Sequence, residues 1–282
     1  MLRLYARLSR GRGLQRLAWK LSRVAGTDAS ALVALDGVRL RVYLSDGYWV
    51  RPLLFTGTYE PEIEAALERA IRPGMPFVDC GANIGYWSLL AAVRYGARVV
   101  AIEPAASSFE RLTENVKLNG EAVETRRAAV WSRSGAVLSL VTHAQRHAGA
   151  SVVNRRERIG VAGYGVEEVE TVTLDQIYRE CFDGEDSVAI KLDVEDAEIE
   201  ALRGARELLD SCDALLVYED HGSDPECRVS QEVLKLPEYG VYRWDDGFVK
   251  ISNLDDLRRI KVSRHTGYNF FGMRADSRFL RL

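Results

Sequence analysis

A short segment of the chain, Phe77 to Gly85 (FVDCGANIG), places an acid, two glycines and an asparagine directly after a run of apolar residues. Gly81 and Gly85 let the backbone approach a ligand without a Cβ in the way, and a helix that begins near Gly85 offers free N–H groups. The spacing lacks the first glycine of the GxGxxG dinucleotide fingerprint. Asp79 at the head of the motif would repel a pyrophosphate, but it suits the ammonium group of a methionine moiety.

Glu103 is a second candidate, 18 residues after Gly85 and at the end of the next apolar run. A carboxylate in this position of a nucleotide-binding sheet can accept hydrogen bonds from both hydroxyls of a ribose. Nicotinamide cofactors and S-adenosylmethionine share that requirement, so Glu103 supports a nucleoside cofactor without selecting one. The structural alternative is a solvated carboxylate at a strand end.

Further acids follow a later apolar run. In Lys191–Glu195 (KLDVE) the charged residues alternate with apolar ones, so they share one face as long as the strand persists. Asp193 lies where a donor methyl group would meet an acceptor, and a carboxylate there orients or deprotonates a hydroxyl. The alternative is structural, because Glu195 and Asp196 also suit the positive end of a following helix.

His221 ends the segment YEDH and is one of four histidines in the chain. Its imidazole titrates near neutral pH, which makes it a candidate general base. The alternative is a loop histidine without a chemical role. The sequence lacks the Asn-Pro-Pro-Tyr signature of amide and base N-methylation, which favours oxygen as the acceptor atom.

The elements that must position these residues alternate between strand and helix. This alternation predicts an α/β fold with a Rossmann-like, doubly wound, mostly parallel sheet of seven strands and right-handed crossovers. Strand patterns occupy residues 75–80, 98–103, 122–131, 136–142, 166–174, 187–194, 213–220, 241–244, 247–251 and 269–275. Helix patterns occupy residues 88–96, 106–120 and 196–209, the second of them opened by Ser107 or Ser108.

Residues 1–56 precede this main domain, which we place at residues 57–282. Residues 1–27 carry seven basic residues and no acid, and an apolar stripe with helical spacing predicts a basic helical arm. The arm packs on the body or on a partner subunit, as in a homodimer, or it contacts a membrane surface. From about Ala31 alternating residues predict a small β cap with a turn at Asp36-Gly37. Residues 142–165 form the one long irregular loop.

Composition limits the class of protein. The net charge is −3, so the body outside the +7 arm carries −10, which disfavours a nucleic-acid partner. No apolar run reaches the roughly 18 residues of a membrane span, and no secretory signal pattern follows the basic start. The four cysteines lack zinc-site spacing, so we predict reduced thiols, a cytoplasmic location and no metal site.

Taken together, these stretches resemble the FkbM family of S-adenosylmethionine-dependent methyltransferases. The resemblance covers roughly residues 57–220 and rests on six segments: GTYEP, VDCGANIGYWSLLAA, AIEPAASSFERLTENVKLNG, AAVWSRSG, VTLDQI and IKLDVEDAEIEALRGA. The glycine motif alone indicates only the fold, whereas the ordered set is far more specific. The family usually methylates hydroxyls of sugars, glycolipids or polyketide-type natural products.

The resemblance also implies roles for individual residues. The methionine part of the cofactor would be cradled by Asp79, Gly81, Asn83 and Gly85. Glu103 would hold the ribose, Ala129 and Val130 would lie near the adenine, and Tyr59 and Glu60 would close over the cofactor, with Asp193 facing the reaction centre. Two residues depart from the family pattern: Cys80 replaces a small aliphatic residue, and Asp196 replaces a glycine.

These observations lead to one hypothesis, an S-adenosylmethionine-dependent O-methyltransferase of enzyme class 2.1.1 that acts on a small hydroxylated molecule. The protein aligns an acceptor oxygen in line with the methyl group. Asp193, His221 and Glu195 are the candidate catalytic residues. The alternatives are methylation of nitrogen, an RNA or protein substrate, a nicotinamide-dependent oxidoreductase, and a non-catalytic cofactor-binding scaffold.

Overall fold

The structure, a computed structural model, describes residues 29–57, 59–143, 146–151, 161, 163–264 and 266–281. The predicted basic arm lies outside the described residues, and so does the segment 152–160 of the predicted irregular loop. No helix in the described part of the chain is long and apolar enough to span a membrane.

The central sheet has eight strands. In spatial order they are β13 (Phe248–Lys250), β12 (Tyr239–Trp244), β14 (Asn269–Arg274), β11 (Asp213–Glu219), β10 (Ser187–Leu192), β3 (Pro76–Cys80), β4 (Arg98–Ile102) and β5 (Val123–Arg126). The five strands from β11 to β5 are parallel, and β14, β12 and β13 pair antiparallel. The predicted fold class is confirmed, but the strand number is eight rather than seven because the short β13 adds a hairpin to β12.

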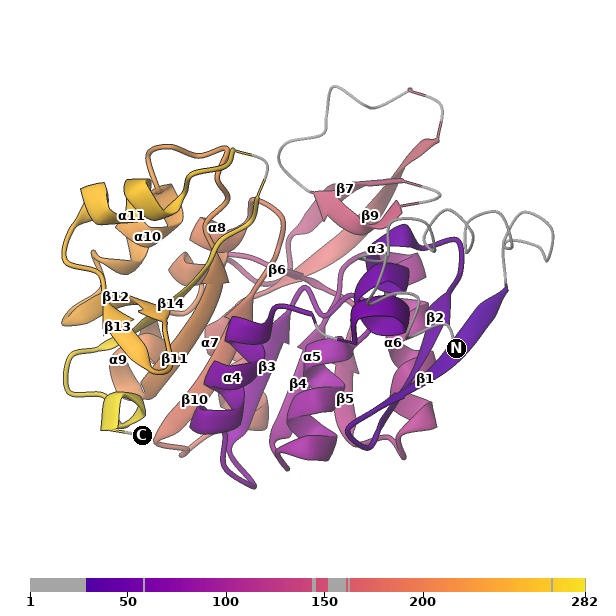
Figure 1. Cartoon of the computed structure of the whole chain (residues 1–282), viewed down its shortest axis with the longest axis horizontal. Helices are drawn as coiled ribbons and strands as arrows, with labels where there is room; N and C mark the ends of the chain where they lie inside the picture. The colour runs from indigo at the N-terminus through magenta and orange to yellow at the C-terminus, as the bar shows by residue number, and fades with distance from the viewer. Residues whose placement is uncertain are drawn as a thin grey trace.

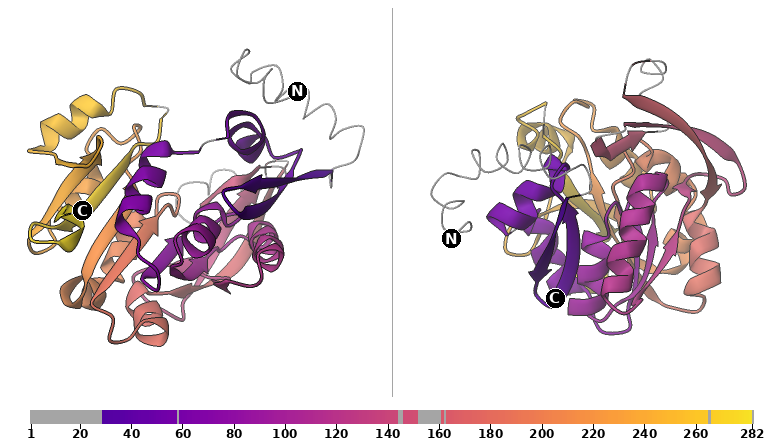
Figure 2. Two further views of the ribbon diagram at one scale, coloured as in Figure 1. Left: turned by 60° about the horizontal axis from the view of Figure 1, so that its bottom comes forward. Right: turned by 90° about the vertical axis from the view of Figure 1, so that its right-hand side faces the viewer.

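Helices cover both faces of this sheet (Figures 1 and 2). One layer contains α4 (Pro61–Ala70), α5 (Tyr86–Leu89) with its continuation η2 (Leu90–Arg94), and α6 (Ala106–Leu118). The layer on the other face contains α7 (Leu174–Cys181), α8 (Glu198–Arg203), α9 (Arg206–Ser211), α10 (Arg228–Val233) and α11 (Leu254–Ile260). The chain ends in the short helix η4 (Arg278–Arg281).

Successive residues of the central strands supply the two cores. Phe77 packs in the first core and Val78 in the second, and Ala189 and Ile190 divide in the same way. Side chains of a strand point alternately to opposite faces, so a strand buried on both faces reads as a continuous apolar run. This pattern explains why the sequence locates these strands well.

One predicted helix is interrupted. Residues 196–209 form α8 and α9, which are separated at Gly204. A Cβ on Gly204 would lie 2.2 Å from the carbonyl oxygen of Trp131, so this position requires glycine for the close approach of two backbones. The helix predicted to open at Ser107 or Ser108 begins slightly earlier, with Ala105 as its N-cap residue.

The described part of the cap is a hairpin of β1 (Ser30–Leu35) and β2 (Val38–Tyr43). Its turn has positive φ at Asp36 (48°) and Gly37 (86°), as the Asp-Gly pair predicts. Two short helical segments follow, α3 (Gly47–Trp49) and η1 (Val50–Thr56). The ion pair between Asp46 and Arg111, 3.1 Å long and largely buried, fastens this cap to α6.

A second sheet rises beside the carboxyl ends of the parallel strands (Figure 1). Its order is β6 (Ala129–Val130), β9 (Tyr164–Val172), β7 (Val137–His143) and β8 (Arg146–Ser151). Part of the predicted irregular loop is therefore strand, because β8 lies within it and β7 and β9 reach its ends.

Candidate active site

The candidate site is a cavity at the carboxyl ends of β3, β4, β10 and β11. The order of the sheet reverses between β3 and β10, and ligands of doubly wound sheets bind at such a switch point. The main chain of the β3–α5 turn forms one side of the cavity, and residues from the cap, β6 and β7 form others.

The turn after β3 is held by close backbone packing. Gly81 has φ +80°, and a Cβ there would lie 1.9 Å from the carbonyl oxygen of Asp193. Asn83, also at positive φ, accepts a hydrogen bond from the indole of Trp49 at 3.0 Å. Gly81 and Asn83 line the cavity as expected. Gly85 does not line the cavity. Its missing Cβ instead leaves room for the side chain of Leu112 on α6, which would lie 2.7 Å from that Cβ.

Asp79 differs from the expectation. Its side chain is buried and lies outside the set of cavity-lining residues. One carboxylate oxygen accepts a hydrogen bond of 2.5 Å from Ser88 on α5, and the other has no hydrogen-bond partner among the residues that the structure describes. Burial raises the pKa of Asp79, while the charge of Lys191 lowers it. Asp79 therefore binds α5 through Ser88, and its charge raises the pKa of Lys191 in the cavity wall.

Lys191 occupies the centre of this charge network. Its ammonium is buried and forms a 2.9 Å ion pair with Asp193. Burial lowers the pKa of Lys191, but the carboxylates of Asp193, Asp79 and Glu60 outweigh burial and raise it. Lys191 and Asp193 both line the cavity. The one ammonium pairs with Asp193, and its charge also favours the ionised forms of Asp79 and Glu60.

Glu103 lines the cavity and is also held by the main chain. Its two carboxylate oxygens accept hydrogen bonds from the N–H groups of Asn83 (2.9 Å) and Ala105 (3.0 Å). Burial raises the pKa of Glu103 to about 7, although these two bonds oppose the shift. Each oxygen retains a free lone pair, so the carboxylate can still accept hydrogen bonds from two ligand hydroxyls.

The far end of the cavity is apolar. Ala129 and Val130 on β6 line it, together with Ile102 and with Leu140 from β7. The predicted placement of Ala129 and Val130 next to a flat, apolar part of a ligand fits this geometry. The second sheet therefore forms one wall of the cavity through β6 and β7.

Aromatic side chains form the wall on the cap side. The set comprises Tyr48, Trp49, Tyr59, Tyr86 and Trp87, and all five line the cavity. Neighbouring rings contact one another with centroid distances of 4.8 to 6.2 Å, and the hydroxyls of Tyr48 and Tyr59 are hydrogen-bonded. Sequence reasoning included Tyr59 but missed the other four. Tyr86 and Trp87 directly follow Gly85 in the sequence, whereas the approach of Tyr48 and Trp49 to the site depends on how the cap docks.

Glu60 supports this wall from outside the cavity lining. Its carboxylate accepts hydrogen bonds from the Trp87 indole and the Asn269 amide, both at 3.2 Å. Burial raises the pKa of Glu60, and Lys191 lowers it. Glu60 therefore links the lead-in segment to α5 and β14, and only its neighbour Tyr59 reaches the cavity.

The loop after β10 contains two successive residues with left-handed backbone, Glu195 (φ 51°) and Asp196 (φ 76°). Glu195 lines the cavity, whereas Asp196 stands where the family pattern has glycine. Glu198 follows, and its buried carboxylate accepts a hydrogen bond from the N–H of Val194 at 3.0 Å. The alternative of a helix that begins at Glu195 does not apply, because α8 begins at Glu198.

The strain at Asp196 leads to a stability prediction. Glycine adopts positive φ without steric cost, whereas other residues lose roughly 1 kcal/mol there. Asp196→Gly is expected to raise the free energy of unfolding by about 0.5–1 kcal/mol, measured by urea denaturation. Asp210→Gly within α9 is the control and is expected to lower it, because glycine weakens a helix interior. Equal destabilisation by both changes would contradict the prediction.

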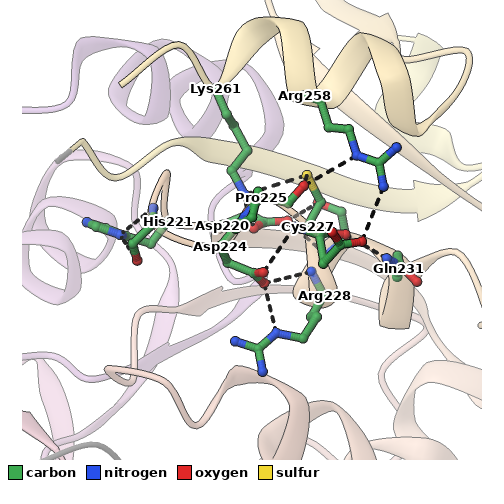
Figure 3. A network of polar contacts seen from close by, with 12 residues as sticks. Asp220, His221, Asp224, Pro225, Cys227, Arg228, Gln231, Arg258 and Lys261 are labelled. Carbon is green, nitrogen blue, oxygen red and sulfur yellow. Dashed lines mark hydrogen bonds and ion pairs between the residues drawn. The ribbon is translucent and has the colours of Figure 1, made fainter. Parts of the chain in front are cut away.

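His221 lies outside the cavity. Its exposed imidazole is hydrogen-bonded to the Ser223 hydroxyl at 2.6 Å, and it lines an adjoining, more open cavity. The neighbouring Asp220 is fully buried and forms a 2.6 Å ion pair with Lys261. Figure 3 shows the His221 side chain directed away from that pair. The structure therefore brings Asp193 and Glu195 to the cavity but leaves His221 beside it.

Glu219, which the candidate set omits, also lines the cavity. It ends β11, directly beside β10 in the sheet. The rule that placed Asp193 at a strand end applies equally to Glu219, so the signal was present in the sequence. Elsewhere, Cys80 is buried in the second core, all four cysteines are free thiols, and no group of three metal-ligating side chains occurs among the described residues.

The sequence matches a known family and is similar to curated proteins. The methyltransferase FkbM domain model matches residues 79–243, so the chain belongs to the FkbM methyltransferase family. A similar curated protein is methyltransferase sdnD of Sordaria araneosa, 31% identical over 48% of this chain and 62% of the relative. Another is hexuronic acid methyltransferase AglP of Haloferax volcanii, 27% identical over 56% of this chain and 64% of the relative.

The chain spans less than two thirds of the length of these two relatives. Among solved structures, a methyltransferase FkbM from Methylobacillus flagellatus KT aligns at 16% identity with a TM-score of 0.43, over 70% of this chain and 43% of that one. A tRNA (uracil-54, C5)-methyltransferase of Pyrococcus abyssi, in complex with S-adenosyl-L-homocysteine, aligns at 12% identity with a TM-score of 0.42, over 75% and 38%.

Proposed function

We propose that this methyltransferase uses S-adenosylmethionine and methylates a hydroxyl of a small molecule such as a sugar, glycolipid or polyketide-type product. The observation that carries the proposal is the graded lining of the cavity. Along the strand order of the central sheet, Lys191 lies in β10 and Asp193 follows it, Asn83 follows β3 and Glu103 follows β4, while Ala129 and Val130 form β6 of the second sheet. We call the β10 side of the cavity its polar end and the β6 side its apolar end. This order of polar, carboxylate and apolar lining residues matches the order of the amino acid, ribose and adenine parts of the cofactor.

When bound, the cofactor supplies a methyl group on a positively charged sulfur, which is already a strong electrophile. The protein then has to orient an acceptor oxygen in line with that methyl group and exclude water. In this proposal the carboxylate of Asp193 orients the acceptor hydroxyl, and its ion pair with Lys191 supports that role. The cap residues Tyr48 and Trp49 also line the cavity, and Trp49 donates a hydrogen bond to Asn83.

The cofactor assignment predicts a pH-dependent affinity. Only the ionised Glu103 accepts two strong hydrogen bonds from ribose hydroxyls, and its pKa of about 7 lies above the ordinary range. Binding of S-adenosylhomocysteine, measured by calorimetry, is therefore expected to tighten from pH 6 to pH 8. Glu103→Gln is expected to weaken it by about 10–100-fold at pH 8 and to remove the pH dependence.

Glu110→Gln is the matched control, since Glu110 is exposed on α6. It is expected to bind S-adenosylhomocysteine as the unmodified chain does. If Glu103→Gln binds with unchanged affinity at pH 8, Glu103 is not the ribose ligand and the orientation of the cofactor proposed here is wrong.

The acceptor class is tested by incubating the purified chain with S-adenosylmethionine labelled on the methyl group. The acceptors are a panel of neutral glycosides, amino sugars, hexuronic acids and phenolic or polyketide alcohols. Magnetic resonance of the labelled product is expected to show a methyl ether. Label on nitrogen, or no transfer to any member of the panel while label appears on RNA or protein, would contradict the proposal. The hexuronic acid relative supports a sugar acceptor.

A further inference from the structure

Glu219 connects two cavities. It lines the cofactor cavity described above, and it also lines the adjoining open cavity that contains His221, Asp224 and Arg228. Of the described residues that line these two cavities, Glu195 and Glu219 alone belong to both. Glu219 therefore stands where a molecule entering from the open cavity would meet the polar end of the cofactor cavity.

The Glu219 side chain is held by packing rather than by hydrogen bonds. A Cβ on Gly267 would lie 2.2 Å from one Glu219 carboxylate oxygen, so the carboxylate rests against the backbone of Gly267. Other acids nearby have donors: Lys191 for Asp193, the Val194 N–H for Glu198, and Lys261 for Asp220. Among the described residues, none donates a hydrogen bond to the Glu219 carboxylate.

The surroundings of Glu219 oppose its negative charge. Burial is the largest cause, and the carboxylates of Asp193, Glu195, Glu198 and Glu60 add repulsion. Together they raise the pKa of Glu219 to about 8. The cation that lines the same cavity, Lys191, is already paired with Asp193, and the buried Lys261 is paired with Asp220. A carboxylate in such surroundings accepts a proton readily at the pH where enzymes commonly work.

We propose that Glu219 is the general base that accepts the proton of the acceptor hydroxyl, an inference that rests on the proposed O-methyltransferase function. The acceptor enters through the open cavity and places its hydroxyl between Glu219 and the polar end of the cofactor cavity. Asp193 orients the acceptor, and Glu219 takes the proton. His221 remains outside, at the edge of the entry route.

The atoms balance as follows. The acceptor O–H bond breaks and its proton moves to a Glu219 carboxylate oxygen, while the oxygen electron pair forms a bond to the methyl carbon. The carbon–sulfur bond breaks, its electron pair stays on sulfur, and the sulfur becomes neutral. Glu219 returns its proton to water through the open cavity, so no further reactant is required.

The test uses Glu219→Gln, which keeps the shape of the side chain and removes the base. With the acceptor that accepts label in the panel above, the turnover rate of the unmodified chain is expected to rise with pH and level off above about 8. Glu219→Gln is expected to lower turnover by roughly 10²–10⁴-fold and to remove this rise. Its affinity for S-adenosylhomocysteine is expected to stay unchanged. Glu226→Gln, on the same loop region but exposed, is the control.

A second readout does not depend on turnover. Because the folded-state pKa of Glu219 is raised, the folded protein holds this proton between pH 4.5 and about 8 while the unfolded chain releases it. The contribution to stability is therefore present at low pH and lost as pH rises towards 8. Glu219→Gln is expected to gain in melting temperature, relative to the unmodified chain, as pH rises from 5 to 8.

The outcomes separate the two proposals. If the unmodified chain methylates no hydroxyl, the proposed function fails and the inference falls with it. If it methylates a hydroxyl and Glu219→Gln retains the rate and its rise with pH, only the inference is overturned. Loss of that rise in His221→Ala instead of Glu219→Gln would likewise overturn it and assign the base to His221. A melting-temperature difference that is independent of pH would also count against Glu219.

Discussion

Gly81→Ala is expected to abolish detectable binding of S-adenosylhomocysteine and to destabilise the protein by about 3 kcal/mol or more. The added Cβ would lie 1.9 Å from the carbonyl oxygen of Asp193, a distance that no contact between these atoms permits. The turn after β3 and the loop after β10 would have to separate. Both line the proposed cofactor cavity, and a displacement of about 1 Å at an active site costs on the order of 100-fold in function.

Gly135→Ala provides a matched control for this experiment. Gly135 has nearly the same backbone conformation (φ +74° against +80°), but a Cβ there meets nothing within 4 Å. Both variants carry the cost of alanine at positive φ, so the difference between them isolates the clash with Asp193. Calorimetry of ligand binding and urea denaturation measure the two effects. Equal behaviour of the two variants would show that the close approach of the two loops is unimportant.

Lys191→Met is expected to reduce the free energy of unfolding by about 3–5 kcal/mol, because removal of one partner leaves buried charges uncompensated. Lys191 forms an ion pair with Asp193, and its charge also favours the ionised carboxylates of Asp79 and Glu60, so the loss of the ammonium removes a favourable charge from all three acids. Denaturation in urea measures the change. Methionine has a similar length and adds no new polar group, which limits other causes of destabilisation.

Lys235→Met is the comparison for this variant, since the Lys235 side chain is 69% exposed and forms a surface ion pair with Glu232. An exposed ion pair contributes roughly 0–1 kcal/mol. A loss of less than about 1 kcal/mol in Lys191→Met would mean that the three acids lose their charge together when the cation is removed, and that the network is not held by Lys191.

The sequence predicts the sheet and its switch point with little ambiguity. Strands such as β3 and β10 are buried on both faces and therefore read as apolar runs, and the acids that follow them mark the ends. The positions of Glu103, Asp193 and Glu195 at the cavity follow from that rule alone. The helices α4, α7, α10 and α11 are not predicted. For α4 the signal was present in the sequence, because its buried Ile63, Ala66, Leu67 and Ala70 have helical spacing, whereas α10 and α11 have only six and seven residues.

The parts of the site that sequence reasoning misses depend on long-range packing. Tyr48 and Trp49 reach the cavity only because β2 and Asp46 dock on α6, which no local pattern encodes. Asp79 heads the glycine motif, yet Ser88, nine residues later, holds it beneath the cavity. His221 has the right chemistry for a base, but its backbone position after Asp220 places the ring in the open cavity.

The aromatic wall of the cofactor cavity also gives the protein a natural optical label. Trp49 and Trp87 both line that cavity, and the chain has five tryptophans in all. Indole emission changes in intensity and wavelength when the ring is shielded from water or meets a charged or stacking group. Intrinsic fluorescence should therefore follow ligand entry in stopped flow without any added dye, with Trp49→Phe and Trp87→Phe separating the cap side of the cavity from the helix side.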